Sequence, residues 1–203
     1  MKNINNYQEL LDLLAQKTNQ RVLLHSCCGP CSSACLELLK TGLNVDIFYA
    51  NSNIDTIKEF DKRVAEQMRI AKILNPKSQV IVHPYDNNEF NEAIKGLEHL
   101  GEKSRRCYQC YQFRMEQCAK YAHEFGYDYW TTTLSISPYK NSEWINEIGV
   151  MLSEKYQVAF IYSNFKLKDG YKLSIALSKE YNLYRQNYCG CLYSKKERGL
   201  IDE

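Results

Sequence analysis

Short apolar runs alternate with longer amphipathic stretches along most of this chain. The apolar runs predict strands, because each is four to seven residues long and is bounded by polar or turn-forming positions: 21–25, 45–50, 79–82, 129–135 and 158–162. The stretches between them predict helices, over 6–16, 32–40, 57–74, 107–125, 142–156 and 171–181. Helix 57–74 has an apolar stripe spaced by three or four residues, at Ile57, Phe60, Val64, Met68, Ala71 and Leu74.

Strands that alternate with helices predict an α/β fold, with a mostly parallel sheet covered by helices on both faces. Such sheets bind ligands beyond the carboxyl ends of their strands, where the loop 25–31 would lie. We expect a single domain over 1–203. Within it, we interpret 84–106 as an insertion or lid, and 185–203 as a C-terminal arm that closes on the site.

The composition is that of a globular protein, with 203 residues of which 44% are hydrophobic and 25% charged. The longest apolar run, 158–162, is far shorter than the ~20 residues of a membrane-spanning helix, and acidic residues at 9 and 12 disfavour a secretory signal. We therefore expect a cytoplasmic protein with no membrane partner. The net charge is only +2, so any binding of nucleic acid requires a local basic patch.

Nine cysteines are the most informative feature of the composition, because an odd number in a reducing compartment does not form a closed set of disulfides. Seven of them form three groups: Cys27, Cys28 and Cys31; Cys107 and Cys110; Cys189 and Cys191. Two thiolates in a C-x-x-C spacing can reach one centre from a turn or a helix N-terminus. The glycine between Cys189 and Cys191 lets both sulfurs turn to one side.

Seven grouped thiols exceed the four ligands of one tetrahedral zinc. They suit an iron–sulfur cluster with a second metal, or two metal sites, and two purely structural zinc sites are the alternative. Cys35 and Cys118 stand apart from the groups among apolar neighbours, so we assign both to the core.

Several polar residues near these groups could take part in the chemistry. His25 precedes the first cysteines and could be a ligand, a proton donor or a buried structural histidine. Arginines at 105, 106, 114 and 185 could offset thiolate charge or bind phosphate, or could simply be solvated surface charges.

A set of motifs spread from about 21 to 195 resembles the epoxyqueuosine reductases of the QueH type. These motifs are HSCCGPCS at 25–32, NSNI at 51–54 followed by Glu59 and Arg63, RCYQCYQFR at 106–114, TTTL at 131–134, SPYK at 137–140 and YRQNYCGC at 184–191. The resemblance implies a fold like that of the adenine nucleotide α-hydrolases (HUP fold). It also implies the reductive removal of the epoxide oxygen of epoxyqueuosine in tRNA, which yields queuosine without cobalamin.

The same resemblance implies a [4Fe–4S] cluster beside a mononuclear iron, and the seven grouped cysteines look like their ligand set. The partners would be a tRNA anticodon loop carrying epoxyqueuosine and an electron donor. Position 31 is Cys or Asp in similar proteins, and both can ligate iron. Candidate proton sources are His25, Tyr108 and Tyr111, and candidate contacts to the substrate base are Tyr139, Lys140 and Arg185.

Two alternatives remain at this point. The first is another metal-dependent tRNA-modifying enzyme, such as a sulfur transferase that activates its base with ATP. Such an enzyme would need a Ser-Gly-Gly-x-Asp-Ser loop after the first strand to hold phosphate, and this chain has SCCGPC at 26–31 instead. The second is a zinc-stapled RNA-binding module without catalytic activity.

Overall fold

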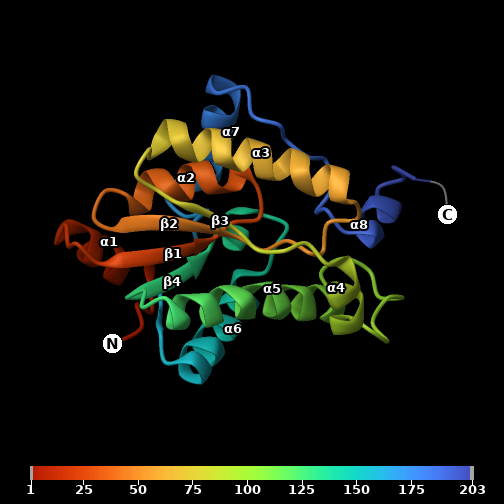
Figure 1. Cartoon of the computed structure of the whole chain (residues 1–203), viewed down its shortest axis with the longest axis horizontal. Coiled ribbons are helices and arrows are strands. Elements are labelled where there is room, and N and C mark those ends of the chain that lie inside the picture. The colour runs from red at the N-terminus through yellow and green to blue at the C-terminus, as the bar shows by residue number, and fades with distance from the viewer. Residues whose placement is uncertain (1, 202–203) are drawn as a thin grey trace.

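Five parallel strands form the central sheet of this computed structural model, which describes residues 2–201 (Figure 1). Their spatial order is β3-β2-β1-β4-β5. The strands are β1 (Arg21–His25), β2 (Asn44–Tyr49), β3 (Val80–Val82), β4 (Tyr129–Thr132) and β5 (Ala159–Phe160). The predicted α/β fold with a parallel sheet is confirmed.

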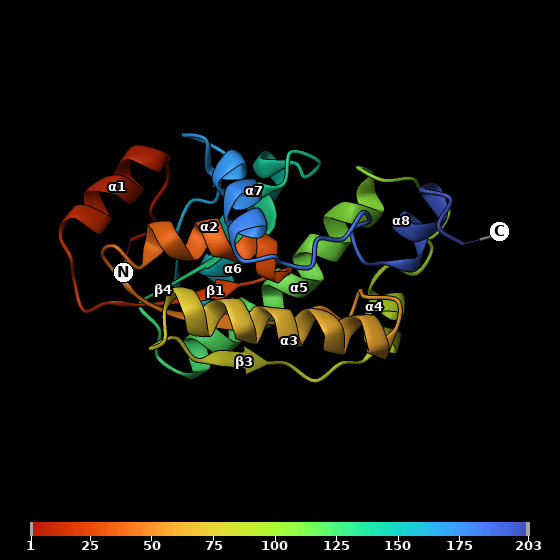
Figure 2. The ribbon, with the colours of Figure 1, turned by 90° about the horizontal axis from the view of Figure 1, so that it is seen from above.

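Helices cover both faces of the sheet, with α2, α3 and α7 on one side and α5 and α6 on the other (Figure 1), and Figure 2 looks onto the side of α2, α3 and α7. The helices are α1 (Tyr7–Ala15), α2 (Gly29–Leu39), α3 (Ile57–Leu74), α4 (Asn87–Ala93), α5 (Arg105–Glu124), α6 (Ser142–Tyr156), α7 (Gly170–Glu180) and α8 (Leu192–Glu197). Among the described residues, no helix is long and apolar enough to cross a membrane.

The two covered faces explain the apolar sequence of β1. Successive side chains of a strand point to opposite faces, and here both faces are buried. Val22 and Leu24 pack with α1 and α2 in one core, whereas Leu23 packs with α5 and α6 in the other. Cys35 and Cys118 lie in these two cores and are almost fully buried, which confirms their assignment to the core.

The prediction of which face of α3 is buried is wrong in part. Ile57 and Met68 belong to the predicted apolar stripe but are 53% and 46% exposed, while Arg63 and Gln67 are buried. Each of these two polar side chains has at least one polar partner, while Arg63 Nη2 and Gln67 Nε2 have none among the described residues. The Arg63 guanidinium pairs with Glu59 at 2.7 Å, and Gln67 accepts a hydrogen bond from the Ser26 hydroxyl at 2.6 Å.

The strand predicted over 129–135 ends early. Residues Thr133–Ile136 form a 3₁₀ turn, because the Thr132 side chain accepts a hydrogen bond from the backbone N–H of Leu134 and bends the chain. The short helices α4 and α8 were not predicted.

The sheet order places a switch point between β1 and β4. The chain leaves β1 into α2 on one face, and leaves β4 toward α6 on the other face. A crevice therefore opens between the two loops beyond the carboxyl ends of these strands, which is where parallel sheets bind ligands.

Candidate metal centre

A cavity of about 390 Å³ lies at this crevice. It is lined by residues from the loops after β1 and β4, from α3 and α5, and from the tail after α7. All seven grouped cysteines line it: Cys27, Cys28, Cys31, Cys107, Cys110, Cys189 and Cys191. The structure thus brings three sequence-distant groups of thiols to one space.

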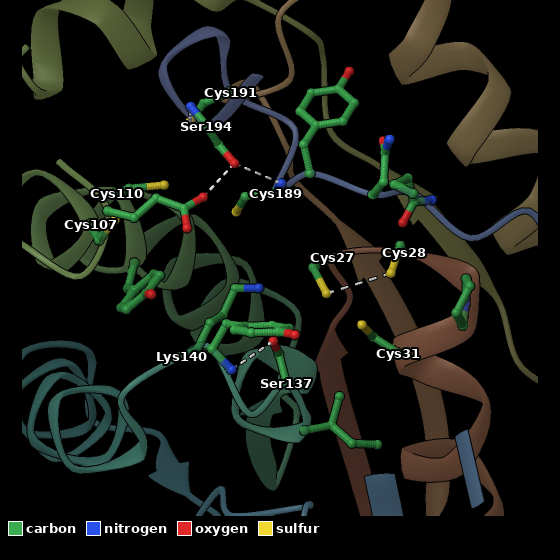
Figure 3. A pocket seen from close by; sticks show the side chains of 18 of the residues that line it. Cys27, Cys28, Cys31, Cys107, Cys110, Ser137, Lys140, Cys189, Cys191 and Ser194 are labelled. Atoms are coloured by element: carbon green, nitrogen blue, oxygen red, sulfur yellow. Dashed lines mark hydrogen bonds between the residues drawn. The ribbon is translucent and has the colours of Figure 1, made fainter. Parts of the chain in front are cut away.

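Three of these thiols form a compact group at the N-terminus of α2, on one side of the cavity (Figure 3). The sulfurs of Cys27, Cys28 and Cys31 all lie within 4.8 Å of one another. Helix α2 begins at Gly29, three residues earlier than predicted, so Cys28 is its N-cap and Cys31 lies in its first turn. The positive end of a helix dipole stabilises negative sulfur.

The protonation of this three-thiol group shows what it can bind. Hydrogen bonds from Cys28 and Cys31 hold the pKa of the Cys27 thiol well below its usual range, and the same contact with Cys27 raises the pKa of Cys28 to about 12. The group by itself therefore favours one negative charge. All three sulfurs can ionise together only when a cation binds them, so this donor set fits a metal ion.

The other four thiols form a second group on the opposite side of the cavity (Figure 3). Cys107 and Cys110 lie on one face of α5, and Cys189 and Cys191 lie on the tail after α7. Burial and the nearby sulfurs raise the pKa of Cys110 to about 11, despite the Arg114 charge. The pKa values of Cys107 and Cys191 are raised as well, so these three thiols also need a positive centre nearby to ionise together.

The tail that carries Cys189 and Cys191 is held by polar contacts on both sides. The backbone N–H of Asp55 donates to the Gly190 carbonyl at 2.9 Å, and Arg63 donates to the Cys189 carbonyl at 3.3 Å. Gly190 has φ +125°, and a Cβ there would lie 3.0 Å from the Arg63 guanidinium. The positive φ therefore favours glycine between these two cysteines, and a larger residue would also press on Arg63.

Sequence reasoning missed two residues that position the tail. The Ser194 hydroxyl accepts from the backbone N–H of Cys189 at 3.1 Å and donates to the Glu102 carboxylate. The Ser194 N–H points to the Cys191 sulfur at 3.4 Å, so Cys191 acts as the N-cap of α8. The spacing Cys-x-x-Ser was the only local signal, and Glu102 lies too far away in the sequence to be linked to it.

Cations far outnumber carboxylates around the cavity. Glu102 is the only Asp or Glu among the described residues that line it. The lining cations are seven: Arg63, Lys103, Arg106, Arg114, Lys140, Arg185 and Arg198. This local excess of positive charge suits both a thiolate-ligated centre and the phosphates of a nucleic acid.

Four of the predicted site residues other than cysteines line the cavity. Lys140 is half-buried and extends toward the space between the two thiol groups (Figure 3). Burial alone would lower the pKa of Lys140, but the negative charges of Cys189 and Cys27 raise it. Tyr111 is buried, and that burial raises the pKa of its phenol, which therefore stays protonated. Tyr139 and Arg185 lie at the exposed rim.

The other two candidates, His25 and Tyr108, do not line the cavity. The Tyr108 hydroxyl donates to Glu147 on α6 at 2.9 Å, so the side chain faces away. His25 is fully buried, with Nε2 3.3 Å from the Ala50 carbonyl and Nδ1 2.8 Å from the Thr132 hydroxyl. Because a carbonyl only accepts, Nε2 carries the single proton, and burial lowers the pKa of His25 to about 3.

This placement favours a structural role for His25. We expect His25→Gln to keep the bound metal and to leave turnover within about tenfold of the wild type. The free energy of unfolding should fall by about 1–3 kcal/mol, because a buried hydrogen-bond partner is left unsatisfied. Metal analysis, turnover and denaturant unfolding measure these effects, and loss of turnover with full metal content would instead make His25 a proton donor.

The parallel sheet and the thiol-lined cavity at its switch point define a metal-binding α/β protein. The sequence profile of "Epoxyqueuosine reductase QueH" matches residues 22–197. The chain therefore belongs to the QueH family of epoxyqueuosine reductases.

Individual relatives support this membership. The chain is 34% identical to the epoxyqueuosine reductase QueH of Streptococcus pyogenes serotype M1, over 96% of this chain and 80% of that protein. It is 38% identical to that of Thermotoga maritima, over 87% of this chain and 91% of that protein. These relatives are reductases, so the sulfur transferase and the zinc-stapled module are not favoured.

A solved structure shares the fold. The U34-tRNA thiolase NcsA from Methanococcus maripaludis, with its [4Fe–4S] cluster, superposes with a TM-score of 0.54. The match covers 92% of this chain and 66% of that one, at 12% identity. At this identity the likeness shows the fold alone.

Proposed function

We propose that this chain removes the epoxide oxygen of epoxyqueuosine in a tRNA anticodon loop, at an iron centre held by its seven grouped cysteines. The main support is that thiols from three distant parts of the sequence line a single cavity in a chain of the QueH family. A structural zinc site would require no such cavity, whereas a reaction needs room for a substrate beside the metal.

The two thiol groups match two kinds of metal site. A [4Fe–4S] cluster takes four thiolates, which is the number contributed by Cys107, Cys110, Cys189 and Cys191. A catalytic metal keeps an open position beside about three protein ligands, which is the number contributed by Cys27, Cys28 and Cys31. We assign the cluster to the four-thiol group and the mononuclear iron to the three-thiol group.

The reaction breaks both C–O bonds of the epoxide and forms a C=C bond. It consumes two electrons and two protons, and the oxygen leaves as water. When bound, the iron centre supplies single electrons and a Lewis acid for the oxygen. The electrons come from an external one-electron donor of low potential.

Residues of this chain supply the charge and the protons. Lys140 places an ammonium toward the space between the two thiol groups, and no hydrogen bond or ion pair occupies its Nζ among the described residues. Tyr111 adds a buried phenol that stays protonated. Both are positioned to stabilise negative charge on the departing oxygen, and a proton held at either group could pass to it.

The rim suits an unpaired nucleotide. Tyr139 is 59% exposed, and unpaired bases stack on aromatic rings of this kind. The Arg198 guanidinium lies 5.7 Å from the Tyr139 ring, and Arg185 lines another part of the rim. These cations can contact phosphates of the anticodon loop. The tail from residue 185 and the segment 84–106 contact each other, through Ser194 with Glu102 and through Arg106 with Glu197, and would then cover the same end of the centre together.

Purification without oxygen tests the proposal. We expect a brown protein with about five irons and about four acid-labile sulfides for each chain, because one cluster and one iron are bound. The purified protein should convert epoxyqueuosine in tRNA when a low-potential reductant is added. A colourless protein that contains zinc and no sulfide would contradict the proposed function.

A further inference from the structure

Arg114 is a buried arginine with no carboxylate partner among residues 2–201. It lies on α5, one turn after Cys110, lines the cavity and is 2% exposed. The other two buried arginines of the cavity each form an ion pair, Arg63 with Glu59 at 2.7 Å and Arg106 with Glu197 at 2.8 Å. Of these three arginines, Arg114 alone has a charge that no carboxylate balances among the described residues.

The contacts of Arg114 do not neutralise that charge. Its Nη2 donates to the side-chain carbonyl of Asn51, whose amide donates in turn to the Ser26 carbonyl at 2.8 Å. Asn51 is neutral, so it orients the guanidinium without balancing it. The Nε of Arg114 is buried and has no hydrogen-bond partner among the described residues.

A buried charge without a partner is strongly unfavourable, so an opposite charge must lie nearby when the protein is in its working state. The nearest negative charges are those of the cysteine sulfurs. Arg114 follows Cys110 by one turn of α5, and it lines the same cavity as all seven grouped thiols. Its charge therefore lies in the space that both thiol groups line.

We propose that Arg114 is the counter-charge of the thiolate-ligated centre and raises its reduction potential. This inference rests on the proposed function. Each electron that enters the centre adds negative charge, and a buried cation nearby stabilises the reduced state more than the oxidised one. The unpartnered Nε–H is also a donor available to sulfur, and hydrogen bonds to sulfur act on the potential in the same direction.

A redox titration of the anaerobic iron-loaded protein, followed by visible absorption, tests this inference. At a fixed applied potential, Arg114→Gln should lower the ratio of reduced to oxidised centre at least about tenfold, which is a shift of about 59 mV for one electron. Arg114→Lys keeps the charge and should stay within about threefold of the wild type. Lys120→Gln is the matched control, because Lys120 is an exposed cation on the same helix and, among the described residues, forms an ion pair only with Glu124.

A second variant separates the effect of the Arg114 charge from the effect of its hydrogen bond to Asn51. Asn51→Ala removes the hydrogen-bond acceptor of Arg114 and keeps the cation, so the potential should stay near that of the wild type. Full iron content with an unchanged potential in Arg114→Gln would overturn the inference. So would a tenfold fall in Arg114→Lys, or equal falls in Asn51→Ala and Arg114→Gln. If Arg114→Gln fails to fold, the Arg114→Lys and Asn51→Ala results still decide. A wild-type chain without iron would overturn the proposed function itself.

Discussion

Alanine in place of a ligand cysteine is expected to release iron and to lower turnover at least about 100-fold. Loss of an outer residue of a metal site already costs 10–100-fold, and no neighbouring side chain offers an equivalent thiolate. Variants of the three-thiol group and of the four-thiol group should lose different parts of the bound iron and sulfide. Cys27→Ala or Cys28→Ala should remove one iron and keep the acid-labile sulfide, whereas the sulfide should be lost from Cys107→Ala, Cys110→Ala, Cys189→Ala and Cys191→Ala. Iron and sulfide analysis of each anaerobic variant makes this measurement.

The two core cysteines are the matched controls. Cys35→Ala and Cys118→Ala should keep both metals and turnover, and should lower the free energy of unfolding by about 1 kcal/mol, because only packing is lost. Cys31→Asp should restore the metal that Cys31→Ala loses, since a carboxylate supplies an oxygen ligand. Iron retained in most of the seven alanine variants would contradict the two-site assignment.

Loss of the Lys140 charge is expected to lower kcat by about 10²–10³-fold, as when a single charge-stabilising donor is removed from an active site. The iron content of Lys140→Gln should not change, because Lys140 is not a ligand. Arg185→Gln should behave differently. It should weaken tRNA binding and reduce the salt dependence of that binding by about one phosphate contact, while kcat at saturation is kept.

Steady-state kinetics at several salt concentrations separate these two effects. Lys168→Gln serves as the control, since Lys168 is an exposed cation that does not line the cavity. If Lys140→Gln changes only KM, then Lys140 binds RNA and does not act on the reacting oxygen. If Arg185→Gln leaves both the affinity and its salt dependence unchanged, the RNA contact lies elsewhere on the protein.

Local sequence patterns were sufficient to predict the sheet and most of the helices. A buried parallel strand requires consecutive apolar residues, and an amphipathic helix requires apolar residues every three or four positions, so both can be read within a window of about ten residues. The grouping of seven cysteines also depends on local spacing, and the cavity contains all seven. Cys35 and Cys118 were separated from them by their apolar neighbours alone.

The failures occur where a residue's environment is set by distant parts of the chain. Helix α3 buries Arg63 and Gln67 instead of Ile57 and Met68. The helix face that carries Arg63 and Gln67 contacts the loop 25–31 and the tail after α7. Tyr108 lies between Cys107 and Cys110 in the sequence and yet turns to α6, since position 108 points to a different side of the helix from positions 107 and 110. Hydrophobicity alone carries no information on either outcome.

The set of seven thiols that line the cavity was therefore contained in the sequence, because it depends on residue type and short spacing. Their division into a group of three and a group of four was not, because Cys107 and Cys110 meet Cys189 and Cys191 only when the tail packs against α5. Other long-range contacts place Lys140 toward the space between the groups and leave Arg114 buried with no carboxylate partner among the described residues. Such distances and charges are properties of long-range contacts, which exist only in the folded chain.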